Sequence, residues 1–285
     1  MVIDGLILVL LTILIVIGMI VCNHWIRKVT NCYFFWTIIA GFFLIWLFIF
    51  RFGPDISRFI HTPITDPSDI QQSIVISKAF MLDVCPFAAI GMCATLIFDP
   101  TRKIARSLAP IALIGGAITV CSVAFDESIH AALTAQFIFI GDPTNSGMKC
   151  YFIMHFIQVV LAVGVMLNTP RNGWKGTLGT LIIISAYYIY VAIVMAATGA
   201  TWNVSGLSIN DWLPEGEYHY VAEIFNIPPK VCQIIGIPIL GLVGCGLIAL
   251  KDYVFDRGWF WYGNAYSGKW YLWYNYNNFV KQKVL

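Results

Sequence analysis

Charged side chains are scarce in this chain. Only 11% of its 285 residues are Asp, Glu, Lys or Arg, and 59% are hydrophobic. A soluble domain carries roughly 25% charged residues, and the mean hydropathy of +0.78 is far above that class. The shortage of charge excludes an ordinary soluble protein and predicts an all-α, polytopic membrane protein.

Two kinds of binding motif are also missing. The net charge is only +2 and the chain has no dense run of Lys and Arg, which argues against nucleic-acid binding. The eight cysteines form no CxxC pair and no Cys/His ligand spacing. We therefore expect no nucleic-acid partner, no metal site and no cofactor. The cysteines are expected to be small buried apolar residues, with Cys85 as the exception.

Long apolar runs make up most of the chain. The first contains Asp4 instead of a basic start and lacks a small-residue cleavage site, so we expect a retained helix and not a signal peptide. We predict a domain of seven transmembrane helices over residues 1–250 and an aromatic-rich cytoplasmic tail over residues 251–285. The expected spans are 3–25, 31–50, 74–98, 107–125, 150–168, 177–199 and 230–250.

Basic residues are distributed unevenly between the two sides of these spans. Twelve Lys and Arg residues fall on the side of the C-terminal tail, and four fall on the opposite side. The side richer in basic residues is normally cytoplasmic. We therefore predict a multi-pass protein of the cell membrane, with its N-terminus outside and its C-terminus in the cytoplasm.

The predicted third span is the one apolar run that carries two charges. Lys78 and Asp83 lie within it, and Cys85 follows directly before Pro86. Ionisable groups at membrane depth are costly, so they usually face the protein interior and mark functional sites. A separation of five residues is a poor but reachable spacing for an ion pair between Lys78 and Asp83.

A histidine in the predicted fifth span adds a second reactive group. His155 lies one or two turns into that span, with Gln158 just below it. A His and a Cys on neighbouring helices can act as general base and thiol nucleophile. The candidate catalytic residues are therefore Cys85, His155, Asp83 and Lys78. The alternative is that the thiol only packs in the core and the imidazole only hydrogen-bonds a carbonyl group.

Three stretches carry a resemblance to a known family. The run MLDVCPFAA is similar to the Leu-x-His-x-Cys stretch of the YwaF-like integral membrane proteins. FIMHFIQVVLAVGVMLNTPRNGWKG resembles that family's later His-containing helix, and IYVAIVMAATGATWNVSG resembles the helix that follows. The resemblance covers roughly residues 73–250. It implies a phospholipid acyltransferase or other lipid-modifying enzyme that uses Cys85 and His155. Asp83 stands where the family has a His, which instead favours a subunit without catalysis.

The regions outside the spans point to partners. The outer loops at 51–73, 126–149 and 200–229 are rich in turn-forming and polar residues, and the second contains an apolar piece expected to be interfacial or re-entrant. The tail holds eleven aromatic residues between Trp259 and Phe279. Such residues suit a membrane interface or a protein docking surface. We expect contact with membrane lipids and, through the tail and outer loops, with other proteins.

Several functions fit these features. The first is a membrane acyltransferase, and the second is a non-catalytic subunit that anchors a larger assembly. A transporter would use Lys78 and Asp83 as a proton or substrate site, but the sequence shows no paired broken helices, which weakens this possibility. A receptor is suggested by the span number alone, which cannot establish function.

Overall fold

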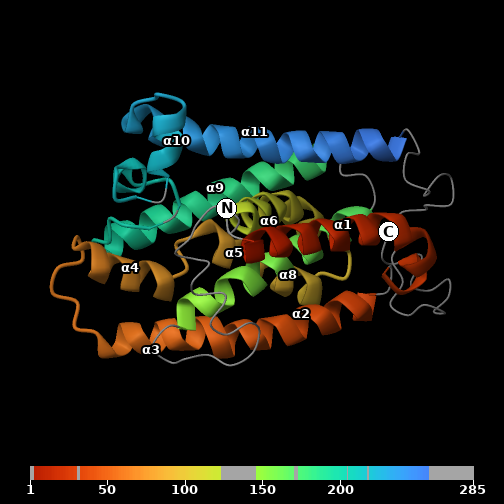
Figure 1. The fold of residues 1–285 in the computed structure, drawn as a ribbon, viewed down its shortest axis with the longest axis horizontal. Coiled ribbons are helices and arrows are strands. Elements are labelled where there is room, and N and C mark those ends of the chain that lie inside the picture. Colours follow the sequence, from red (N-terminus) through yellow and green to blue (C-terminus); the bar gives the residue numbers. More distant parts are fainter. Residues whose placement is uncertain are drawn as a thin grey trace.

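The computed structural model describes residues 3–30, 33–122, 146–169, 173–203, 205–216 and 218–256. This part of the chain is almost entirely helical and contains no strand, which confirms the all-α prediction. The long helices form a bundle, with α11 along one edge and α2 and α3 along the opposite edge (Figure 1). The elements are α1 (Ile3–Thr30), α2 (Tyr33–Leu47), η1 (Phe48–Phe52), α3 (Gly53–His61), α4 (Ile70–Ala79), α5 (Val84–Phe98), α6 (Lys103–Ser122), α8 (Ser146–Asn168), α9 (Gly173–Thr198), η2 (Ile209–Trp212), α10 (His219–Ile224) and α11 (Pro229–Asp256).

The described chain has five helical segments that are long and apolar enough to cross a membrane. The helices α1 and α8 add shorter apolar stretches at Val9–Cys22 and Ile153–Asn168. Each of the seven predicted runs is mostly helical where it is described, while the number of spans and their orientation stay predictions. The five segments are Tyr33–His61, Ile70–Phe98, Lys103–Cys121, Gly173–Thr198 and Pro229–Tyr253.

Small side chains form the centre of the bundle, where α5, α6 and α8 meet. Without a Cβ, Gly164 on α8 admits the ring of Trp36 from α2, because a methyl group built there would lie 2.0 Å from that ring. Small residues let helix backbones approach closely, which is how helices associate inside lipid. The alanines that are almost completely buried in this core are Ala40, Ala88, Ala89, Ala105, Ala109, Ala112 and Ala162.

The first outer loop is much shorter than the predicted 51–73. The helix continues through η1, a π-helical turn in which the Gly53 amide bonds the Phe48 carbonyl, and through α3 to His61. Pro54 does not end the helix because it falls in the first turn of α3, where its missing N–H is not needed. The connection between α3 and α4 therefore covers only residues 62–69.

The predicted third span, 74–98, is not one continuous helix. It consists of α4 and α5, separated by residues 80–83. Met81 adopts a left-handed conformation (φ 55°) and the Leu82 amide bonds the Ser77 carbonyl at 2.9 Å, which closes the end of α4. Asp83 is the N-cap of α5, and Pro86 fits because it falls in that helix's first turn.

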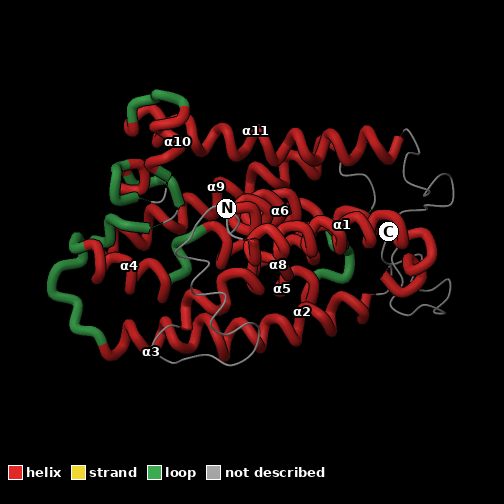
Figure 2. Tube along the Cα trace, in the orientation of Figure 1, coloured by secondary structure: helices red, strands yellow, loops and turns green. Residues whose placement is uncertain are grey.

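The longest described loops gather at one end of the bundle, around α3, α4 and α10 (Figure 2). We call this the α10 end, and it is the outside in the predicted orientation. At the opposite end α11 continues to Asp256, six residues beyond the predicted end of the membrane domain. The apolar piece of the second outer loop and the aromatic tail lie outside the described residues.

Candidate functional site

The break between α4 and α5 contains an ion pair. The buried carboxylate of Asp83 accepts a hydrogen bond from Lys78 Nζ at 2.5 Å and another from Ser77 Oγ at 3.1 Å. Asp83 makes no capping bond with its side chain, since the carboxylate is directed to these partners. A buried charge is tolerated when it is paired and hydrogen-bonded, and both conditions hold here.

Two tyrosines of α9 hold the backbone of the break. Tyr187 Oη donates to the Leu82 carbonyl at 2.6 Å, and Tyr190 Oη donates to the Phe80 carbonyl. The two side chains are three residues apart and so lie on one face of α9. Backbone groups released by a break at membrane depth must find partners in the protein. The break is therefore supported by its neighbouring helix.

A second irregular helix faces the same carboxylate. Arg51 lies in the π-helical turn η1, is buried, and forms an ion pair with Asp55 one turn later. Its charge also acts on Asp83. The prediction that Arg51 belongs to an outer loop is wrong, because the helix continues past it. The i, i+4 spacing of Arg51 and Asp55 at the end of an apolar run could have indicated the helix.

Cys85 lies in the first turn of α5 and faces α6. Its Sγ is 4.0 Å from Thr119 Oγ1. A methyl group on Gly115 would lie 3.0 Å from that sulfur and 3.6 Å from Gln158 Nε2, so the thiol and the amide converge on this glycine. Gln158 is fully buried and donates to the Ala112 carbonyl at 3.0 Å.

His155 is buried on α8, one turn before Gln158. The side chain that contacts the Cys85 sulfur is Thr119, from α6. The structure thus joins two of the four candidate residues, Lys78 and Asp83, in one ion pair and places Cys85 within the next turn. The catalytic roles of the four residues remain predictions. Among the described residues, no three His, Cys, Asp or Glu side chains are grouped as metal ligands.

The loop between α9 and α10 lies close to this site. Asp211 is buried in it and accepts hydrogen bonds from the amides of Asn203 (3.2 Å) and Gly206 (2.8 Å). Burial raises the pKa of Asp211 to about 7, since removing a carboxylate from water disfavours its charge. Burial also raises the pKa of Tyr218, and the charge of Asp83 acts on Tyr218 as well. These electrostatic contacts connect the α10 end to the helix break.

Comparison with known proteins places the chain in a family. The family of unknown function DUF5378 matches residues 8–256, so the chain belongs to it. Uncharacterized protein MG135 of Mycoplasma genitalium is 27% identical over 169 residues, which are 58% of this chain and 59% of that protein. The Uncharacterized protein MG135 homolog of Mycoplasma pneumoniae is 31% identical over 166 residues, 57% of this chain and 56% of the relative. The chain thus matches less than two thirds of the length of these relatives. No solved structure matches it.

The predicted resemblance to the YwaF-like family is wrong. The match over residues 8–256 is to DUF5378, and neither Mycoplasma relative points to a YwaF-like protein or an acyltransferase. The resemblance depended on short apolar stretches with one Cys or one His. Such stretches recur in unrelated membrane proteins because the bilayer restricts the composition of every spanning helix.

Proposed function

We propose that this member of the DUF5378 family is a carrier that moves protons across the membrane, with Asp83 as the proton-binding group. The observation that carries the proposal is the helix break that holds Asp83 and Lys78 inside a membrane-spanning segment. Carboxylates in spanning helices mark proton pathways, and discontinuous helices form the ion sites of many transporters. At the level of sequence, the absence of paired broken helices weakens this possibility, and the described residues contain one such break, between α4 and α5.

The charges around Asp83 favour its ionised form, so proton binding there requires the ion pair with Lys78 to open. While Asp83 is ionised, Lys78 and the nearby Arg51 stabilise its negative charge. Protonation removes that charge and weakens the ion pair, so Lys78 and α4 are released from α5. One third of the Lys78 side chain is exposed, which leaves the pair accessible from its surroundings. Proton binding is thereby coupled to a movement at the break.

Other polar groups lie on either side of Asp83, and in this proposal they form the route for the proton. Toward the α10 end, the charge of Asp83 acts on Asp211 and on Tyr218. Toward the core, Cys85 contacts Thr119 and shares the space beside Gly115 with Gln158. In this proposal Cys85 and the buried His155 belong to the proton route and do not act as nucleophile and base.

The proposal includes seven spans in the predicted orientation. The apolar stretches of α1 and α8 would be the two spans added to the five long segments. With the N-terminus outside, the α10 end faces the exterior and the proton route begins at the loop that contains Asp211. The positive-inside distribution of Lys and Arg supports this orientation.

Proton flux in liposomes tests the function. The purified protein would be reconstituted with a pH-sensitive dye inside, and a potassium gradient with valinomycin would supply an electrical driving force. We expect proton uptake by the wild type and a loss of at least about tenfold in Asp83→Asn, which cannot ionise. Glu223→Gln changes an exposed carboxylate of α10 and is the matched control, with expected flux like the wild type. Equal flux in wild type and Asp83→Asn would reject the proposal.

An anchoring role in a larger assembly is the second candidate. The observation that favours it is an exposed apolar pair at the α10 end, Ile224 and Phe225, which are 73% and 66% exposed. Exposed apolar side chains next to each other suit a protein interface or the membrane surface. The aromatic tail, on which the sequence argument for partners depended, lies outside the described residues, so that argument stays a prediction.

A further inference from the structure

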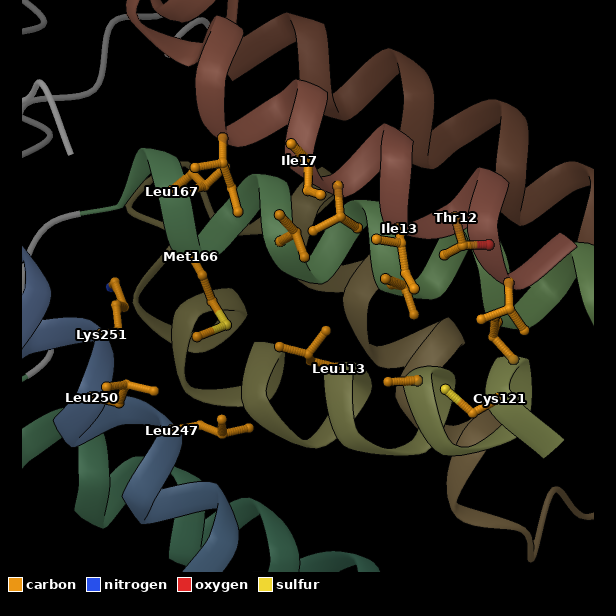
Figure 3. Close-up of a pocket in the computed structure, with 17 residues that line it drawn as sticks. Thr12, Ile13, Ile17, Leu113, Cys121, Met166, Leu167, Leu247, Leu250 and Lys251 are labelled. Atoms are coloured by element: carbon orange, nitrogen blue, oxygen red, sulfur yellow. The ribbon is translucent and has the colours of Figure 1, made fainter. Parts of the chain in front are cut away.

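An apolar groove of about 430 Å³ lies between α1, α6, α8 and α11. Figure 3 shows α1 along one side and α6 along the other, with Lys251 at one end and Thr12 and Cys121 at the opposite end. The groove does not include Cys85, so it is separate from the helix break. Its volume lies in the range of pockets that hold small organic ligands.

The walls of the groove suit a hydrocarbon chain. Nearly all its lining side chains are aliphatic, among them Val16, Leu113 and Val163. Ile13 and Ile17 of α1 line the groove and are still about half exposed, at 47% and 50%, so α1 does not fill it. Apolar walls without contacting atoms lose dispersion energy, which an acyl chain from the bilayer restores.

One end of the groove holds a basic side chain. Lys251 lines the groove at this end, and its Nζ donates to Thr169 Oγ1 at 3.3 Å. The charge of Arg106, on the first turn of α6, acts on Lys251. Asp252 acts on Lys251 with the opposite sign and accepts a hydrogen bond from the Gly173 amide at 2.8 Å. Burial and the charge of Arg106 favour the neutral form of Lys251, so an anionic group at this end would stabilise its protonated form.

We propose that the groove binds one acyl chain of an anionic phospholipid, with the phosphate of its headgroup at the Lys251 end. The apolar walls contact the chain, and the charges of Lys251 and Arg106 attract the phosphate. In the predicted orientation this end is cytoplasmic, where anionic lipids attract basic groups at the membrane surface. The site is independent of the proposed proton transport, since none of its residues belongs to the proton route.

Native mass spectrometry of the full chain tests this site. The detergent-solubilised protein would be titrated with phosphatidylglycerol and with phosphatidylcholine of identical acyl chains, and separately with oleate. We expect one tightly bound phosphatidylglycerol, with at least about fivefold weaker binding of phosphatidylcholine. Equal binding of the two phospholipids would overturn the role of the charged end. Binding of oleate in preference to phosphatidylglycerol would overturn the choice of a phospholipid.

Variants locate the lipid on the protein. Lys251→Met removes the charge but keeps an apolar side chain, and we expect it to abolish the preference for phosphatidylglycerol. Lys175→Met changes an exposed lysine of α9 and should leave the preference intact. Ala117→Phe places a ring in the groove and should reduce the binding of both phospholipids. Melting temperatures within a few degrees of the wild type would show that each variant is folded, and unchanged binding in a folded Ala117→Phe would overturn the site.

Discussion

At the scale of single residues, the site combines two buried carboxylates in different settings. Asp83 is paired with Lys78 inside a span, whereas Asp211 is held by backbone amides in a loop outside the spans. The two are coupled, because the charge of Asp83 also raises the pKa of Asp211, although burial is the larger cause. In the predicted orientation, we propose that external pH acts on the α10 end through Asp211.

The raised pKa of Asp211 predicts a pH-dependent stability. An acid whose pKa rises from 3.8 to about 7 on folding binds more protons in the folded state between these values. The folded state is then favoured at low pH and loses about 1.4 kcal/mol per pH unit as the pH rises through this window. The free energy of unfolding of the wild type, relative to Asp211→Asn, should fall from about pH 4 to about pH 7 and then stay constant.

Unfolding of both proteins in detergent over this pH range would measure the difference. Asp211→Asn should itself be less stable at low pH, because one of the two backbone amides loses its acceptor, at a cost of about 1–3 kcal/mol. A difference between the two proteins that does not change from pH 4 to pH 7 would contradict the raised pKa.

At the scale of helices, apolar length predicted the elements but not their ends or interruptions. The run 74–98 indicated one span because the residues on both sides of Asp83 are mostly apolar. The local signal for a helix start was present, since Asp83 precedes a Pro in the first turn of α5. The tyrosines that stabilise the break come from α9, more than 100 residues later, and no local pattern contains that contact.

In the candidate site, the contacts between residues close in sequence could be predicted, and the contacts from other helices could not. Lys78 and Asp83 lie close in sequence, so their spacing alone allowed an ion pair. Arg51 and Thr119 reach the site through the packing of other helices, which a single sequence does not show. Charges within an apolar run were thus the informative signal, and short motifs with one Cys or His were not.

The close approach of α2 and α8 gives a prediction at this scale. Gly164→Ala would place a methyl group 2.0 Å from the Trp36 ring, so the two helices must separate. Overpacking of this kind costs about 1–3 kcal/mol. The matched control is Gly41→Ala on α2, where a methyl group would meet nothing within 4 Å. Thermal unfolding should show a melting temperature below that of the wild type for Gly164→Ala. Gly41→Ala should not lower the melting temperature. Similar melting temperatures for the two variants would contradict the packing of Trp36 against Gly164.

At the scale of the whole molecule, two separate features lie in different parts of the bundle. The helix break and the loop above it concentrate ionisable groups toward the α10 end. The apolar groove lies between α1 and α11 and ends at Lys251, near the opposite end. Proton transport is proposed for the first feature and lipid binding for the second. Each can fail without the other, because their residues do not overlap.

The central claim is that Asp83 binds and releases a proton while the protein stays folded. Infrared difference spectroscopy measures this directly, because a protonated carboxylic acid has a carbonyl stretch that a carboxylate lacks. Lowering the pH of the reconstituted protein should produce several such bands in the wild type. One of them, from Asp83, should persist in Glu223→Gln and be missing in Asp83→Asn, which keeps the band of Asp211. An Asp83→Asn protein that lacks none of the wild-type carboxylic acid bands would contradict the claim and leave the ion pair with a structural role alone.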